Sequence, residues 1–431
     1  MFLYNLVIQL FNLGINISSM FKPKAKLWVN GRKNWKENLK LNVKDLQLQN
    51  SVWMHCASLG EFEQGRTVIQ KIREENPSQK IVLTFFSPSG YEIQKNFALV
   101  DYVCYLPIDS KRNANCFLEI LKPKIAIFVK YEFWLNFLFQ LHEHKIPTFL
   151  ISTVIKKHQS FFKWYGGNFR KALMTYEAIY TQDLESLNLL NQLNYHKAKL
   201  AGDTRFDRVL DVCKSPKKIN FFEEFYKNAF VVIGGSTWQK DEEYLVEAYI
   251  NLKEKHPKLK LIIAPHEIDD ASIEKIKNLL TKNNITYHLY SDNDVEAHHS
   301  VLVLNTIGIL SSIYQYGNVA FVGGGFNNGI HNLLEPSVFG LPVLFGPNHN
   351  KFNEASELIN LHAGFEVLNG KDLYHYLEKF INDSEFLNKT SQFSKNYVLK
   401  NAGSTDVIYL GLKTYLSASL LHVFLLLNFI F

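Results

Sequence analysis

The feature that most constrains this chain is an alternation of short apolar runs with longer helix-like stretches. Runs rich in Val, Ile, Phe and Tyr are typical of buried strands. Their alternation with helices predicts an α/β fold, with parallel sheets covered on both faces. The first series of strand-like runs comprises Ser51–Cys56, Lys80–Phe86, Tyr102–Leu106, Lys124–Val129 and Pro147–Ser152. The second comprises Phe230–Ile233, Lys260–Ala264, Ile285–Leu289, Val301–Leu304, Val319–Val322 and Pro342–Phe345.

The alternation of strand-like and helix-like segments is interrupted once, between Arg208 and Glu224, where Pro216 stands among lysines. We therefore expect two Rossmann-like, doubly wound domains facing a cleft, because open α/β sheets bind ligands at the carboxyl ends of their strands. The expected parts are an N-terminal helix with a basic segment (1–40), an N-terminal domain (41–207), a linker (208–224), a C-terminal domain (225–413) and an apolar tail (414–431).

Composition narrows the class of protein further. The 431 residues are 47% apolar and 20% charged, which excludes a disordered, collagen-like or polytopic membrane protein. The net charge of +6 is a mild excess, and no nucleic-acid partner is expected from it. The four cysteines form no CxxC pair and are typical of thiols in a reduced compartment.

The N-terminal segment Met1–Phe21 carries no charged side chain and can be a signal peptide, a spanning helix or an in-plane helix. A signal peptide has its basic residues first, whereas here they follow the apolar segment. The polar side chains recur at helical spacing, so they share one stripe while the leucines face elsewhere. This pattern favours an amphipathic helix in the membrane interface, because polar groups in hydrocarbon are costly. The stripe comprises Asn5, Gln9, Asn12, Asn16 and Ser19.

The basic run after this helix would lie near anionic headgroups, at ~1 kcal/mol per residue. The alternative is an ordinary buried helix followed by a solvated charged loop. The tail Thr414–Phe431 is also uncharged but contains His422 and Asn428, so a docked terminal helix or a second interfacial contact is expected. The basic run comprises Lys22, Lys24, Lys26, Arg32, Lys33, Lys36 and Lys40.

Three strand-to-helix junctions carry candidate chemistry. Glu61 follows the run Trp53–Cys56, where a carboxylate can act as a general base or simply favour a helix N-terminus. Gly234–Thr237 offers two glycines and two hydroxyls, which suit phosphate binding or a capped turn. The segment Gly323–Pro336 is glycine-rich but is no dinucleotide fingerprint, and Glu335 one turn into its helix can accept ribose hydroxyls.

Weaker candidates lie elsewhere. Asp292, Asp294, His298 and His299 can be drawn as a metal site, but a solvated loop is the better interpretation. Lys156 stands in a Lys-Lys-His run that can meet an anionic ligand or simply be solvated, and Arg205 precedes the linker, where it can face the cleft.

Five ordered segments resemble the 3-deoxy-D-manno-octulosonic acid (Kdo) transferases of lipopolysaccharide assembly, over roughly residues 20 to 405. WMHCASLGE resembles W-x-H-x-x-S-x-G-E, KYEFWLN resembles E-x-E-x-W-P-N, and AGDTRFD resembles G-N-x-K-F-D. GGSTWQKDEE resembles G-S-T-H-x-G-E-E. The fifth segment, GGGFNNGIHNLLEPSVFGLPVLFGP, resembles the family's G-G-H-N-x-L-E-P-A region.

The resemblance implies the two-domain GT-B glycosyltransferase fold and inverting transfer of Kdo from CMP-Kdo to the lipid A precursor, lipid IVA. It implies no metal and no cofactor, since CMP-Kdo is a substrate. The N-terminal domain would bind the acceptor on the cytoplasmic face of the inner membrane as a monotopic protein, and the C-terminal domain would bind CMP. Glu61 matches the family's catalytic base. Donor contacts are expected from Ser236, Thr237, Pro265, His266, Gly308, Asn332 and Glu335, and acceptor or phosphate contacts from Ser58, Gly60, Glu132, Lys156 and Arg205.

Four positions depart from the family pattern. Trp238 stands for the usual His, Ile330 for a Gly, Asn305 for an acidic residue and His266 for an Arg. Two other functions remain open at this point. One is a different GT-B enzyme, a nucleotide-sugar transferase or epimerase using UDP, and the other is a non-catalytic membrane-attached nucleotide-sugar binding protein.

Overall fold

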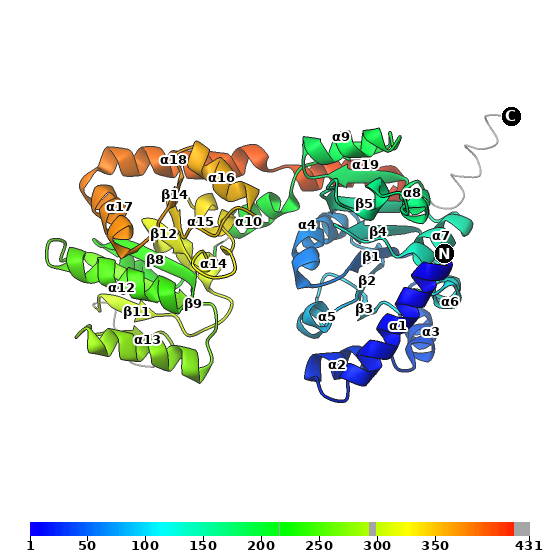
Figure 1. The fold of residues 1–431 in the computed structure, drawn as a ribbon, viewed down its shortest axis with the longest axis horizontal. Helices are drawn as coiled ribbons and strands as arrows, with labels where there is room; N and C mark the ends of the chain where they lie inside the picture. Colours follow the sequence, from blue (N-terminus) through cyan, green and yellow to red (C-terminus); the bar gives the residue numbers. More distant parts are fainter. Residues whose placement is uncertain (215, 293–298, 418–431) are drawn as a thin grey trace. The chain divides into compact units, whose positions relative to one another are not determined.

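The computed structural model describes residues 1–214, 216–292 and 299–417, which form two compact units (Figure 1). Unit 1 contains Met1–Arg208 and the segment that begins at Ala402, and unit 2 contains Val209–Asn401. Each unit is built on one seven-stranded parallel sheet. The expected α/β class with two doubly wound domains is therefore confirmed.

The sheet of unit 1 has the strand order β3-β2-β1-β4-β5-β6-β7. Because β1 pairs with both β2 and β4, the strand order reverses at β1. Ligands bind at such a reversal in open sheets. The strands are β1 (Val52–Cys56), β2 (Ile81–Phe85), β3 (Tyr102–Tyr105), β4 (Ile125–Val129), β5 (Thr148–Thr153), β6 (Ala178–Thr181) and β7 (Ala198–Leu200). The helices after β1 are α4 (Leu59–Glu75), α5 (Pro88–Gln94), α6 (Lys111–Leu121), α7 (Leu135–Glu143), α8 (Gly167–Leu173) and α9 (Leu184–Gln192).

Both faces of this sheet are covered because neighbouring strand residues point to opposite sides. Trp53 and Phe128 lie in one apolar cluster with residues of α6 and α7. Met54 and Ile127 lie in a second cluster with residues of α4 and of α19 (Ser404–Ser417). Burial on both faces explains why these strands are almost continuously apolar.

The sheet of unit 2 has the order β10-β11-β9-β8-β12-β13-β14 and reverses at β8. Its strands are β8 (Phe230–Thr237), β9 (Leu259–Pro265), β10 (His288–Leu289), β11 (Val301–Val303), β12 (Val319–Val322), β13 (Val343–Phe345) and β14 (Gly364–Glu366). Its helices include α11 (Asn220–Tyr226), α12 (Gln239–Lys253), α13 (Asp270–Lys282), α14 (Leu310–Ile313), α15 (Leu334–Val338), α16 (Asn353–Asn360), α17 (Gly370–Asn382) and α18 (Ser384–Asn401).

The domain boundaries differ from those expected at two places. The expected linker is largely helical, because α10 (Thr204–Lys214) and α11 occupy most of it. Residues 402–413 do not belong to the C-terminal domain: α19 packs on α4 in unit 1, as Figure 1 shows. Asp207 fixes this return, since its carboxylate accepts the backbone N–H of Gly403 and of Thr405, at 2.6 and 2.7 Å. The expected tail begins inside α19, and residues 418–431 lie outside the described residues.

Three helices precede the sheet of unit 1, and α1 runs along the outside of the unit beside α2 (Figure 1). Tyr4, Asn5 and Asn12 are partly buried on the side of the helix toward the protein, whereas Gln9 and Asn16 of the polar stripe are exposed. Leu3, Leu6 and Leu10 are exposed as well. The predicted N-terminal helix is therefore confirmed, with several of its leucines turned away from the fold. Among the described residues, none of the helices combines the length and the apolar character that crossing a membrane requires. The helices are α1 (Phe2–Ser18), α2 (Pro23–Asn30) and α3 (Trp35–Asp45).

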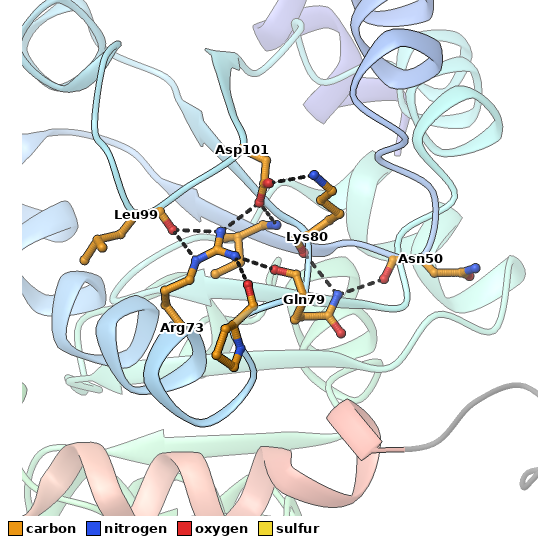
Figure 2. A network of polar contacts seen from close by, with 8 residues as sticks. Asn50, Arg73, Gln79, Lys80, Leu99 and Asp101 are labelled. Carbon is orange, nitrogen blue, oxygen red and sulfur yellow. Dashed lines mark hydrogen bonds and ion pairs between the residues drawn. The ribbon is translucent and has the colours of Figure 1, made fainter.

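The amino end of this sheet is held by a polar network around Asp101 (Figure 2). Its carboxylate accepts Arg73 at 2.8 Å, Lys80 at 3.0 Å and the Ile81 backbone N–H at 2.9 Å. Burial acts to raise the pKa of Asp101, but these hydrogen bonds outweigh it and leave the pKa lowered. Arg73 lies in the last turn of α4, so the network anchors one end of that helix while its other end carries Glu61.

Candidate functional site

In unit 1 the candidate site begins where β1 turns into α4. Ser58 is the N-cap of α4, and Glu61 lies in the first turn. The Ser58 hydroxyl donates a hydrogen bond to the Glu61 carboxylate, which is partly exposed. The helix dipole favours negative charge at this position. Gly60 is exposed, and a Cβ there would meet only Ser58 Oγ at 3.8 Å, so the backbone beside Glu61 is open.

A buried polar network lies beside this junction and joins β1, β2 and the loop after β4. His55 is fully buried on β1, and its Nδ1 lies 2.9 Å from Thr84 Oγ1 on β2. Its Nε2 lies 3.3 Å from the carboxylate of Glu132, which follows β4. The Trp134 indole N–H points at both groups, at 3.2 Å from His55 Nε2 and at hydrogen-bond contact with Glu132. The Glu132 carboxylate is only 7% exposed, and its polar neighbours are the His55 ring nitrogen and the Trp134 indole.

The backbone after β4 explains how Glu132 reaches this place. Lys130 has φ 74°, in the left-handed region, which turns the chain sharply at the end of the strand. The hydroxyl of the fully buried Tyr176 then donates to the Glu132 carbonyl oxygen at 2.6 Å. Sequence reasoning identified Glu132 only through a motif. No local pattern indicated that Thr84 and His55 would meet it, because they come from different strands.

The two basic candidates of unit 1, Arg205 and Lys156, have different surroundings. Arg205 is held by Asp203, with Nη2 and Nε at 2.7 and 2.8 Å from its carboxylate. The pKa of Tyr131 is raised by burial and by the charges of Asp183 and Glu61, and Arg205 opposes this rise, so these groups share one electrostatic environment. Lys156 is exposed in a turn in which its backbone N–H donates to Gln159.

In unit 2, two glycine-rich turns pack against one another. A Cβ at Gly323 would lie 2.4 Å from the Ser236 carbonyl oxygen and 2.6 Å from Thr237 Cα, so only glycine fits. Asp241, buried in α12, joins the turns: its Oδ2 accepts the backbone N–H of Trp238 and of Gly324, both at 2.9 Å. Burial raises the pKa of Asp241 to about 6, against these hydrogen bonds. Sequence analysis did not single out Asp241.

Two departures from the family pattern meet in one ring cluster with His331. Trp238 Nε1 donates to His331 Nε2 at 3.1 Å, which leaves the proton of a neutral His331 on Nδ1. His266 stacks on both rings, with centroids 4.9 Å from Trp238 and 4.3 Å from His331. Burial and the neighbouring His266 lower the pKa of His331. The cluster presents aromatic faces at the carboxyl ends of β8 and β9.

Of three other predicted donor residues, Gly308 and Asn332 lie on the loops after β11 and β12, and Glu335 lies in the first turn of α15. Gly308 has φ +90°, which explains its residue type. The Asn332 side chain makes two hydrogen bonds with α15. Its Nδ2 donates to the Glu335 carboxylate at 3.1 Å, and its Oδ1 accepts the Leu334 backbone N–H at 3.0 Å. The buried Tyr314 has a raised pKa, through burial and then through the charge of Glu335. Its hydroxyl would be 1.9 Å from a Cβ at Gly235, so these loops also pack closely.

A cavity of about 400 Å³ opens between the first turns of α12 and α13. Thr237 and Pro265 line it, whereas the other predicted donor residues do not. Its charged lining includes Lys240, Lys275 and Glu242.

Glu242 makes the stability of the protein depend on pH. Burial raises its pKa from 4.5 to about 7, against a 3.0 Å hydrogen bond from Thr237. The stability that protonation provides is therefore present below pH 4.5 and is lost as pH rises through about 7. We expect Glu242→Gln to remove this loss, on the order of 3 kcal/mol between pH 5 and 8. Urea unfolding at both pH values measures it. The neighbouring Glu243→Gln, at a more exposed side chain, serves as the control, and an unchanged pH slope in Glu242→Gln would contradict the assignment.

A metal site is not visible in the part of the chain that the structure describes, where no three His, Cys, Asp or Glu side chains gather suitably. Two members of the weak candidate, Asp294 and His298, lie outside the described residues.

The sequence is similar to those of known transferases. Residues 33–208 match the family model described as 3-deoxy-D-manno-octulosonic-acid transferase (kdotransferase). The 3-deoxy-D-manno-octulosonic acid transferase of Aquifex aeolicus is 29% identical over 339 residues, which are 77% of this chain and 86% of that protein.

Solved structures support the fold. The UDP-GlcNAc 2-epimerase of Neisseria meningitidis matches with a TM-score of 0.61 at 15% identity, covering 84% of this chain and all of that one. A glycosyltransferase from Rickettsia africae matches with a TM-score of 0.56 at 12% identity, covering 86% of this chain and 100% of the other. The arrangement of two parallel sheets is thus the GT-B fold, as expected.

Proposed function

The chain belongs to the Kdo transferase family of glycosyltransferases, and on that premise we propose that it moves Kdo from CMP-Kdo to the lipid A precursor, lipid IVA, with inversion at the anomeric carbon. The observation that carries the proposal is Glu61 at the first turn of α4, with Ser58 donating to its carboxylate. This carboxylate is partly exposed at the carboxyl end of the central strand β1, where an acceptor hydroxyl can reach it.

The proposed step is a single displacement. Glu61 takes the proton of an acceptor sugar hydroxyl while that oxygen attacks the anomeric carbon of Kdo. The bond from that carbon to the phosphate oxygen of CMP breaks, and CMP leaves with the electron pair. The new bond forms opposite the breaking one, so the configuration inverts. Ser58 keeps the carboxylate oriented, and the buried pair of Glu132 and His55 forms the adjoining wall of the acceptor side.

On the donor side we assign CMP to the loops of unit 2. Backbone N–H groups near Thr237, at the start of α12, suit the negative charge that develops on the phosphate. The ring cluster of Trp238, His266 and His331 offers aromatic faces to a base or sugar. Glu335 has the carboxylate chemistry that ribose hydroxyls require, and Lys156 and Arg205 are assigned to acceptor phosphates. No metal or cofactor is included in this proposal.

The exposed side of α1 supports attachment to the inner membrane as a monotopic protein. Phe2 is 85% exposed and Leu10 58%, on a helix that has no buried residue. Lys22, Lys24 and Lys26 follow directly and are exposed, which suits anionic headgroups. A contiguous apolar surface of this kind marks an interaction site.

We expect the double variant Leu6→Ser/Leu10→Ser to bind anionic vesicles at least ~10-fold more weakly. The reason is that moving a leucine side chain from water into lipid stabilises binding by roughly 1.5–3 kcal/mol. Vesicle co-sedimentation of the full chain measures this. Ile93→Ser, an exposed apolar residue on α5, is the matched control and should bind like the wild type. Equal binding of all three proteins would refute the lipid-facing assignment of α1.

The function itself is tested by incubating the full chain with CMP-Kdo and tetraacylated lipid A precursor in detergent. We expect a Kdo-lipid product and release of CMP. A folded protein that binds CMP but yields no product would support a non-catalytic binding role. Turnover of a UDP-sugar instead would place the chain with the other GT-B enzymes.

A further inference from the structure

We infer that α1 supports the acceptor-side site as well as facing lipid: Tyr4, together with Asp109, is a positioning residue that holds the first turn of α7 and thereby Trp134 and Glu132. The inference rests on the proposed function, because it is that proposal which assigns Glu132 to the acceptor side. Its structural basis is independent of that assignment and consists of two contact chains that start on α1. One ends at the backbone amides directly after Trp134, and the other ends at the Trp134 ring.

The first contact chain is polar and completes the N-terminus of α7. The first three backbone N–H groups of a helix lack partners within the helix. Here Asp109, from the loop after β3, accepts two of them, Asn136 at 3.1 Å and Phe137 at 2.9 Å. The Tyr4 hydroxyl accepts the third, from Leu135 at 3.3 Å, and donates its own proton to Asp109.

Burial explains why this hydroxyl matters. Asp109 is 2% exposed, and burial raises its pKa, against the hydrogen bonds that it accepts. Burial and the charge of Asp109 likewise raise the pKa of Tyr4, so the phenol stays protonated and remains a donor. Without the hydroxyl, one buried carboxylate loses a donor and one helix amide loses an acceptor. Asn5 adds a second contact, since its side-chain oxygen accepts Asn136 Nδ2 at 3.0 Å.

The second contact chain is aromatic. The Phe11 ring lies 5.9 Å from Phe86, and Phe86 lies 4.6 Å from Trp134, between ring centroids. The buried Arg32 fixes the middle of this chain: its Nη2 donates to the Phe86 carbonyl oxygen at 2.8 Å, and its guanidinium lies 3.7 Å over the Trp28 ring. Residues of α1 therefore reach Trp134 from two directions.

Trp134 is the point at which both chains meet the candidate site. It is the N-cap of α7, directly before the amides that Tyr4 and Asp109 hold. Its indole N–H contacts Glu132 and His55. A change in the first turn of α7 therefore moves the donor that sets the position of the Glu132 carboxylate. The lipid-facing leucines, such as Leu6 and Leu10, take no part in these contacts because they lie on the other side of the helix.

The test compares Tyr4→Phe, which keeps the ring packed on Phe169 and removes the hydroxyl, with Leu10→Ser on the lipid side of the same helix. In Tyr4→Phe we expect hydrogen exchange at the amides of residues 135–137 to become at least ~5-fold faster. We expect kcat for the detergent-dispersed acceptor to fall about fivefold, with KM for CMP-Kdo and vesicle binding unchanged. Leu10→Ser should weaken vesicle binding and leave the exchange of these amides unchanged. Asp109→Asn should speed the exchange of these amides more than Tyr4→Phe does and should lower kcat further, because Asp109 accepts two of the three amides.

Several outcomes would overturn the inference. Exchange in Tyr4→Phe as slow as in the wild type would remove the structural link between α1 and α7. Faster exchange with an unchanged kcat would show that the link does not position the reacting groups. If KM for CMP-Kdo rises in Tyr4→Phe, and kcat falls equally in Asp109→Asn and Leu10→Ser, the variants destabilise the protein in general and the inference fails. If the wild type transfers no Kdo, the proposed function fails, while the exchange measurement still decides whether Tyr4 holds α7.

Discussion

Glu61→Ala is expected to lower the rate of Kdo transfer by a factor of ~10²–10⁴, the range that positioned acid–base groups contribute. The reason is that the proposed step needs one proton removed from the acceptor hydroxyl. Within unit 1, Glu61 is the partly exposed carboxylate held by Ser58 at the carboxyl end of β1. CMP affinity should stay at the wild-type value, because the donor contacts are assigned to unit 2. Product formation under saturating CMP-Kdo, with CMP binding measured by calorimetry, checks both halves of this expectation.

The matched control for this variant lies two residues further along the same helix. Glu63 carries the same charge and pairs with Arg66 and Arg208 at 3.6 and 3.3 Å. Its replacement by Ala removes one negative charge from α4 without touching the proposed base. We expect transfer by Glu63→Ala within about twofold of the wild type. If Glu61→Ala and Glu63→Ala show equal rates, Glu61 is not the base, although the family assignment is unaffected.

Asp241→Ala is expected to destabilise unit 2 by roughly 2–4 kcal/mol and to weaken CMP binding at least ~10-fold. Its carboxylate is 1% exposed and accepts two backbone N–H groups from two turns that are distant in the sequence. Removing the carboxylate leaves the buried Gly324 amide and the partly buried Trp238 amide without this acceptor. The two glycine-rich turns would then lose the carboxylate that joins them and, with it, their alignment. Urea unfolding and calorimetric titration with CMP measure the two effects.

Two further variants distinguish loss of the hydrogen-bond acceptor at Asp241 from loss of a negative charge on α12. Asp241→Asn keeps an acceptor oxygen and removes the charge, so it should recover most of the lost stability. Glu247→Ala, six residues further along the same helix, changes a carboxylate outside these turns and should cost less than about 0.5 kcal/mol. If Asp241→Ala unfolds at the same urea concentration as the wild type, the carboxylate does not hold the two turns together.

The sequence by itself determined the secondary structure of the central strands and the character of α1. Strand residues such as Met54 and Ile127 are buried on both sheet faces, so an apolar run bounded by turns predicts them without tertiary information. The stripe from Asn5 to Ser19 likewise follows from helical periodicity alone. Edge strands gave a weaker signal. β7 has only three residues, of which Leu200 is 43% exposed, and the prediction missed it.

Only the tertiary structure decided which distant residues meet. Asp207 draws the chain back so that α19 packs on unit 1, which no local pattern indicates. Trp238, His266 and His331 come from three loops, and His55, Thr84 and Glu132 come from two strands and the loop after a third. Periodicity depends on neighbours three or four residues apart, whereas these contacts depend on the order of strands in the sheet. A motif can name such a residue, but only the packed sheet sets its neighbours, its burial and therefore its pKa.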